Sequence, residues 1–247
     1  MLERAATAAA ACERADLGSL WVSESPGPAG VGTSYEAYSL LGALAVRSVK
    51  VRLGVVADGS ERRAPSILAK IVTGVDVISH GRGVLALDGD CATGTDAERL
   101  SEALIVSRAV LVDEHPTYAG RIYSVDGAVN RPAPVQDGGV PIVVFLHGRG
   151  PGLGALLDVA ARSADVVVVD GGSGGVDDVR RRLAERVGVR PDPLGPLGII
   201  GRIGPGAVGP GTHRQIAAIR SAGATGCLVG VSYPWDPDLV EGLYAAW

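Results

Sequence analysis

The chain has 247 residues, 47% of them hydrophobic, with a formal net charge of −4 and a mean hydropathy of +0.25. No apolar run approaches the ~20 residues that a membrane-spanning helix needs, and no basic stripe of the kind that binds nucleic acid is present. Cys12, Cys91 and Cys227 are scattered and odd in number, which argues against a disulfide framework or a zinc site and suits a reducing compartment. We therefore expect one cytoplasmic domain over residues 1–247, close to the ~250 residues of an α/β barrel.

In chain order, helical and strand-like patterns alternate. Hydrophobic spacing predicts helices over residues 2–15, 35–48, 65–78, 96–112, 153–163, 176–187, 212–222 and 237–247. Short apolar runs predict strands over residues 19–23, 51–57, 84–87, 141–146, 165–169, 197–203 and 227–231. Such alternation is typical of a parallel α/β protein.

The clearest unit runs from Val51 to Leu87. A β-branched run is followed by Pro65, which suits the first position of a helix because its missing N–H would be unpaired there. Apolar residues then recur at helical spacing up to Ile78, and Gly81 suits the left-handed position after a helix. A second strand follows, so the segment predicts a βαβ unit with a right-handed crossover.

The same stretch carries a family resemblance. It contains Arg63-x-Pro-x-x-Leu-Ala-Lys70 and Asp76-Val-Ile-Ser-x-Gly-Arg82, and further blocks read Ser19-Leu-Trp-Val-Ser-Glu24 with Tyr35-Glu-Ala-Tyr38, Tyr118-Ala-Gly-Arg-Ile-Tyr123, Val125-Asp-Gly127 and Pro132-Ala-Pro-Val-Gln136. These blocks resemble the luciferase-like flavin monooxygenases, with the branch that uses the deazaflavin coenzyme F420 as the nearest. They cover most of the first 170 residues and weaken after that.

The resemblance implies a TIM-type (β/α)8 barrel. This chain begins in a predicted helix and offers only seven strand-like runs. Either the true start lies upstream, or the barrel is open where its first strand should be, and we expect a barrel that lacks its first strand. The open edges could be covered by a loop, by a strand from the glycine-rich segment 203–211, or by a partner chain. A homodimer is therefore left open.

Barrel enzymes build their sites where strands end. The candidate segments are those that follow the predicted strands, namely Glu24-Ser25, Ala57-Asp58, Asp88 to Asp90, His147 to Gly152, Asp170 to Gly172, Arg202 to Gly206 and Ser232-Tyr233.

The strongest of these segments reads His147-Gly148-Arg149-Gly150-Pro151-Gly152, between a strand and a helix. Glycines allow close backbone approach, the N–H groups of a first helical turn bind anions, and Arg149 could add a charge-assisted bond. In the resembling family this loop holds the cofactor phosphate, although the usual pattern has small residues where this chain has His147 and Arg149. A solvated glycine-rich turn remains the alternative.

The other candidates are single positions. The resemblance places Ala57 and Asp58 behind the flavin ring, where a small residue permits contact, and Gly89 is grouped with these cofactor positions. Glu24 and Asp88 are the candidate catalytic carboxylates. Each also suits an ordinary loop, because Asp-Gly-Asp is common turn chemistry and Ser25 stands where the family often has a histidine.

Two features are absent from the sequence. The four histidines are isolated, and no Ser/His/Asp set or metal cluster is apparent from their spacing. The segment from Asp88 to Thr95 is about half as long as the family's substrate wall, so we expect a more open pocket.

Three functions stay open on this evidence. The first is an F420-dependent, or alternatively FMN-dependent, oxidoreductase that moves a hydride between its cofactor and a small organic substrate. The second is a non-catalytic protein of the same family that carries, stores or senses the cofactor. The third is a barrel kept as an interaction partner. The family's habits favour the first, whereas Ser25 and the short segment favour the second.

Overall fold

The fold is known from a computed structural model. It describes residues 2–23, 36–57, 63–90, 96–147, 152–185, 196–204 and 208–231, together with Val240 and Leu243. The helices in these ranges are α1 (Leu2–Arg14), α2 (Ala37–Ala45), α3 (Pro65–Ile78), α4 (Asp96–Val112), α5 (Leu153–Ser163), α6 (Gly172–Ala184) and α7 (Thr212–Ser221). The strands are β1 (Ser19–Val22), β2 (Arg52–Val55), β3 (Leu85–Asp90), β4 (Tyr118–Ala119), β5 (Ser124–Val125), β6 (Ile142–His147), β7 (Val166–Val169), β8 (Gly198–Ile203) and β9 (Gly226–Val229).

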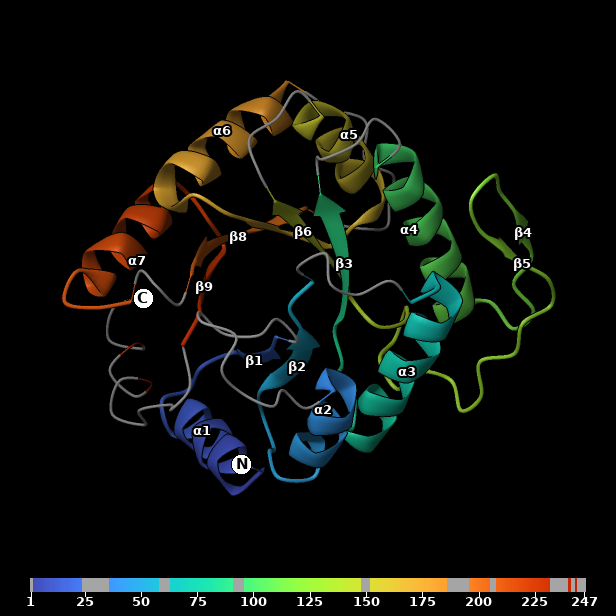
Figure 1. The fold of residues 1–247 in the computed structure, drawn as a ribbon, viewed down its shortest axis with the longest axis horizontal. Coiled ribbons are helices and arrows are strands. Elements are labelled where there is room, and N and C mark those ends of the chain that lie inside the picture. The colour runs from blue at the N-terminus through green and yellow to red at the C-terminus, as the bar shows by residue number, and fades with distance from the viewer. Residues whose placement is uncertain are drawn as a thin grey trace.

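Seven of these strands form the inner wall of a barrel, and the helices form a ring around it (Figure 1). β1 and β2 pair in parallel, and β3, β6, β7, β8 and β9 form a second parallel sheet in that order. Among the described residues, one backbone bridge joins the two sheets, between Leu53 and Gly83 near the start of β3. The predicted alternation and the parallel sheet are confirmed.

Among the described residues, strand pairing does not close the barrel. Within the described residues, β1 pairs only with β2, and β9 pairs only with β8. α1 precedes β1 in the chain, as the sequence predicted. The part of the chain that the structure describes is a TIM-type barrel with seven strands in its wall.

Side chains alternate between the two faces of the barrel wall, as strand geometry requires. Odd positions such as Leu85, Leu87 and Val167 face the helices in the large core. Even positions on β3 and β7 and odd positions on β6 face the interior, where Ala86, Phe145 and Val168 pack together. On β3, β6, β7 and β8 the next interior position at the carboxyl end is polar, and these four positions form the barrel mouth.

Two strand ends differ from the prediction. Asp88, Gly89 and Asp90 do not form a turn, because β3 continues through Asp90 in a parallel ladder with β6. Likewise, His147 does not open a loop but is the last residue of β6. Both strands extend beyond their predicted ends, because the backbone groups of each strand hydrogen-bond to those of the other.

Two residues of the motif Asp76 to Arg82, at the end of α3, bind backbone groups of neighbouring elements. Arg82 is buried, and its guanidinium donates to the carbonyls of Ala45, Ser48, Val51 and Ser79 and to the Ser48 hydroxyl. The end of α2, the start of β2 and the end of α3 are thereby tied to one side chain.

Asp76 acts in the same way on the other side of the motif. Its carboxylate accepts from the N–H groups of Gly83 and Val135 at 3.1 and 2.8 Å and from the Gln136 amide at 2.7 Å. The long connection before β6 is thereby fixed to α3. Asp76 and Arg82 are structural residues.

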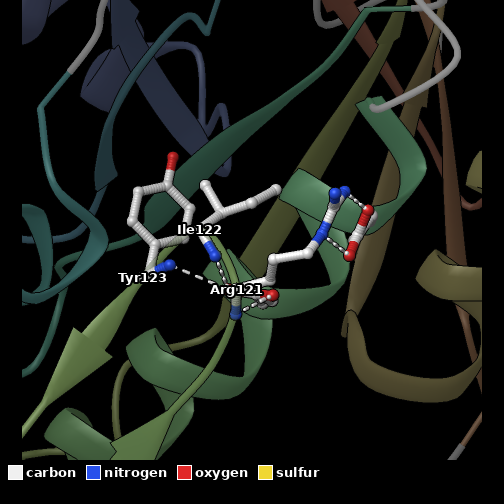
Figure 2. A network of polar contacts seen from close by, with 5 residues as sticks. Arg121, Ile122 and Tyr123 are labelled. Carbon is white, nitrogen blue, oxygen red and sulfur yellow. Dashed lines mark hydrogen bonds and ion pairs between the residues drawn. The ribbon is translucent and has the colours of Figure 1, made fainter.

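The hairpin of β4 and β5 lies outside the ring, against α4 (Figure 1). Figure 2 shows the consecutive N–H groups of Arg121, Ile122 and Tyr123 converging on one carboxylate, that of Glu102 on α4, at 2.8–2.9 Å. The bond from Tyr123 does most to lower the pKa of Glu102, against the opposing effect of burial. A Cβ at Gly120 would meet this carboxylate and the Tyr118 ring, so a larger residue there would have to displace one of them.

Candidate functional site

The candidate site is the barrel mouth, formed by the carboxyl ends of β2, β3, β6, β7 and β8. Its members are one main-chain carbonyl and four charged or ionisable side chains, namely Ala57, Asp88, His147, Asp170 and Arg202. They come together because parallel strands end at the same edge, and because each side chain follows the interior positions of its strand by two residues.

His147 is at the centre of this cluster. Its Nδ1 lies 2.9 Å from Asp170 Oδ2, and its Nε2 lies 2.6 Å from the carbonyl oxygen of Ala57. Nε2 is also 3.6 Å from Asp88 Oδ1. The imidazole therefore spans from β7 to the end of β2, across β3.

The electrostatics of the pair are consistent with opposite charges. The hydrogen bond to Asp170 is the largest cause of a raised pKa at His147; burial opposes it, and Ala57 and Asp88 add to it. Burial acts to raise the pKa of Asp170, but the bond from His147 and the charge of Arg202 outweigh it and lower that pKa. These interactions favour the charged form of His147 and the ionised form of Asp170.

Arg202 brings the remaining charge to the mouth. Its Nε lies 3.4 Å from Asp170 Oδ1, so Asp170 lies between two cationic side chains. Its Nη1 is buried and has no hydrogen-bond partner among the described residues. This atom is the donor in the cluster that a ligand acceptor could satisfy.

Aromatic rings form the floor beneath the cluster. The His147 ring stacks over Phe145 with centroids 6.1 Å apart, and Trp21 meets Phe145 edge-on at 5.5 Å. Trp21 packs so closely on β2 that a Cβ at Gly54 would lie 2.5 Å from its ring. The floor is therefore apolar, and the ionisable groups of the site lie above it.

Comparison with known proteins identifies the scaffold. The family model described as luciferase-like monooxygenase matches residues 1–191. The chain belongs to the luciferase-like monooxygenase family.

Solved structures agree with this assignment. An F420-dependent secondary alcohol dehydrogenase, solved with an F420-acetone adduct, superimposes with a TM-score of 0.80 at 16% identity, covering 100% of this chain and 94% of the other. The coenzyme F420-dependent tetrahydromethanopterin reductase from Methanopyrus kandleri gives 0.74 at 13% identity, covering 99% and 94%. A monooxygenase from Streptomyces bottropensis gives 0.72 at 16% identity, covering 99% and 91%. At these identities the likeness establishes the fold alone.

Within this luciferase-like barrel, the sequence-predicted site residues have different outcomes. Ala57, Asp88 and His147 do come together at the mouth. Gly89 lies in β3, where a Cβ would meet Leu146 and the Phe145 carbonyl at 3.0 Å. The face on which a side chain would stand is therefore packed against β6. Gly152 immediately precedes α5 as its N-cap residue. The predicted residues Glu24, Asp58, Gly148, Arg149 and Gly150 lie outside the described residues.

Sequence reasoning missed the pairing of His147 with Asp170 and treated the histidines of this family member as isolated. Asp170 and Arg202 were named only as the first residues of loops that follow strands. The period-2 pattern could have grouped them, because Asp170 and Arg202 follow the interior residues Val168 and Ile200 by two positions.

Among the described residues, no helix is both long and apolar enough to cross a membrane.

Proposed function

We propose that this chain is an F420-dependent, or alternatively FMN-dependent, oxidoreductase that transfers a hydride between its cofactor and a small organic substrate. The observation that carries the proposal is the charged cluster of Asp88, His147, Asp170 and Arg202 at the mouth of a luciferase-like barrel. This is the end of the barrel at which barrel enzymes carry their sites. The names of two structural neighbours, which include F420, support the cofactor class.

The residues of the mouth fit a flavin or deazaflavin ring. Such a ring carries carbonyl acceptors along one edge and has flat apolar faces, so its site needs a hydrogen-bond donor and a small neighbour. Arg202 Nη1 is a buried donor without a partner among the described residues. Ala57 offers only a methyl group. When bound, the cofactor supplies the hydride chemistry itself.

The chain's own groups have separable roles in this proposal. The bond to Asp170 favours the charged form of His147, which can stabilise negative charge that develops on a substrate oxygen. Asp170 keeps that imidazole charged and oriented. Phe145 and Trp21 exclude water from below.

The proposal retains the phosphate site predicted from the sequence, over Gly148, Arg149, Gly150 and Gly152. Replacing Arg149 with alanine should cost about 1–3 kcal/mol of binding free energy, the scale of one charge-assisted hydrogen bond. Arg162, exposed in the last turn of α5, offers a matched control. If R149A binds as R162A does, the phosphate assignment is wrong.

The test of function is an anaerobic titration of the protein with F420 and with FMN, followed by a hydride-transfer assay. Saturable binding of one cofactor and its reduction or oxidation by a small alcohol, ketone, enone or quinone is the expected result. Absence of binding by both cofactors would refute the proposal.

A second function is favoured by one observation. β3 ends at Asp90 and α4 begins at Asp96, so residues 91–95 alone separate them. A segment of this length can contribute little to a wall around a substrate. A cofactor carrier or sensor has no substrate to enclose, so it would not need such a wall. Tight binding without turnover, in stopped-flow mixing of reduced cofactor with a panel of quinones, enones and nitroaromatics, would support this function instead.

A further inference from the structure

The imidazole of His147 contacts two groups that can only accept hydrogen bonds. Asp170 is a carboxylate whose pKa is lowered, and Ala57 contributes a main-chain carbonyl oxygen. A neutral imidazole has one N–H and can donate to one of them. Both contacts, at 2.9 and 2.6 Å, are hydrogen bonds only if both ring nitrogens carry protons.

Loss of the proton on Nε2 would place a lone pair opposite the Ala57 oxygen at 2.6 Å. Two acceptors at that distance repel, so the contact must open. The neutral ring keeps one proton, and the charge-assisted bond to the Asp170 carboxylate favours Nδ1 over Nε2 as its position. Deprotonation therefore breaks one specific link, between β6 and the end of β2.

That link occurs where the barrel wall has no backbone pairing. Leu53 joins β2 to β3, because its N–H donates to the Arg82 carbonyl and its own carbonyl accepts from the Val84 N–H. Further along, no backbone ladder joins β2 to β3 among the described residues, and the Val56 N–H donates to the Val22 carbonyl on the other side. The imidazole thus takes the place of a ladder at the carboxyl end of β2.

The charged groups around the ring come from three strands. Asp88 on β3 and Asp170 at the end of β7 are anionic neighbours, and Arg202 on β8 contacts Asp170 rather than the ring. The two carboxylates favour the charged form of the imidazole. Arg202 disfavours that form, because its positive charge pairs with Oδ1 of Asp170 and partly neutralises this carboxylate. Phe145, beneath the ring, is uncharged.

We propose that His147 is a doubly protonated positioning residue, whose bridge from Asp170 to the Ala57 carbonyl couples ligand binding at the barrel mouth to one proton. The coupling to a ligand rests on the proposed function, because the ligand is the deazaflavin or flavin cofactor. The bridge itself is independent of that function.

The first experiment measures the bridge without a ligand. Long-range ¹H–¹⁵N spectra of the full chain are recorded between about pH 5 and 9, the range in which histidine titrates. The chain has four histidines, and the His147 signals are those that disappear in H147Q. Both ring nitrogens should be protonated at about pH 7, and the pKa of His147 should be lower in D170N than in the parent.

The matched control is D178N. It makes the same change of carboxylate to amide on α6, where Asp178 pairs with Arg182 at 2.9 Å and does not contact His147. The titration of His147 should be the same in D178N and the parent. A neutral His147 at about pH 6, or an equal pKa in D170N and D178N, would overturn the bridge.

The second experiment measures the coupling. Dissociation constants for F420 and FMN are determined across the same pH range for the parent, H147Q and D170N. Above the titration of His147, the parent should lose about tenfold in affinity per pH unit, as linkage to one proton requires. H147Q should show no such slope, and in D170N the loss should begin at lower pH.

The outcomes separate the two proposals. Binding of either cofactor with no pH dependence in this range overturns the coupling and leaves the proposed function standing. No binding of either cofactor overturns the proposed function and the coupling with it, while the spectra still decide the protonation of His147.

Discussion

The bond network of Arg82 gives the sharpest prediction for stability. A guanidinium has five N–H donors, and the structure pairs Arg82 with five acceptors, all at 2.8–2.9 Å. The ammonium of lysine has three donors, so Arg82→Lys must leave at least two of these acceptors unmet. Each buried, unsatisfied polar group costs about 1–3 kcal/mol, which predicts a loss of about 2–6 kcal/mol in the free energy of unfolding.

The assay is urea unfolding followed by far-ultraviolet circular dichroism. Arg47→Lys is the matched control, because Arg47 comes just before Ser48 but its side chain is about half exposed and pairs with Glu3 at 3.5 Å. An exposed pair of this kind contributes little, so R47K should change stability by less than about 0.5 kcal/mol. Equal stabilities for R82K and R47K would refute the reasoning that one guanidinium joins α2, β2 and α3.

Two further predictions concern packing and pH. Gly54→Ala places a Cβ 2.5 Å from the Trp21 ring and should lower the free energy of unfolding by about 1–3 kcal/mol. Gly74 lies in open space within α3, so Gly74→Ala should raise the free energy of unfolding by about 0.5–1 kcal/mol. Thermal melts of both variants test these expectations. The raised pKa of His147 contributes stability that is present below its ordinary value of 6.5 and is lost as pH rises through the folded pKa. The lowered pKa of Asp170 contributes stability that is present above 3.8 and is lost as pH falls through the folded pKa. The difference in unfolding free energy between the parent and D170N should therefore be largest between about pH 4 and 6.5 and shrink on both sides, and a flat difference would contradict the ion pair.

The sequence predicted most elements because their signals are local. The bounds predicted for α4 and α5 agree with the structure, since each helix has a long apolar stripe and clear ends. The seven strands of the barrel were all predicted, because buried parallel strands are short β-branched runs. The last predicted helix, over residues 237–247, lies mostly outside the described residues.

The errors arise where distant contacts override local preference. Asp88-Gly89-Asp90 has the composition of a turn, but the ladder with β6 supplies its backbone bonds and Gly89 fits the narrow space beside Leu146. The hairpin of β4 and β5 has strands of two residues each, too short for any periodic signal. It is held by Glu102, a residue of α4 whose role no local pattern reveals.

The residues that carry the family resemblance and the residues of the candidate site are different sets. Asp76 and Arg82 satisfy buried backbone groups far from the mouth, so their chemistry fixes where the strands end. His147 and Asp170 stand on those strand ends, and neither belongs to a resemblance block. A scaffold of this kind can hold its geometry while the groups at the mouth change, because no bond of Asp76 or Arg82 depends on them. Membership of the family therefore predicts the fold and suggests the cofactor class, whereas the reaction must be argued from the four charged side chains that this chain places at the mouth.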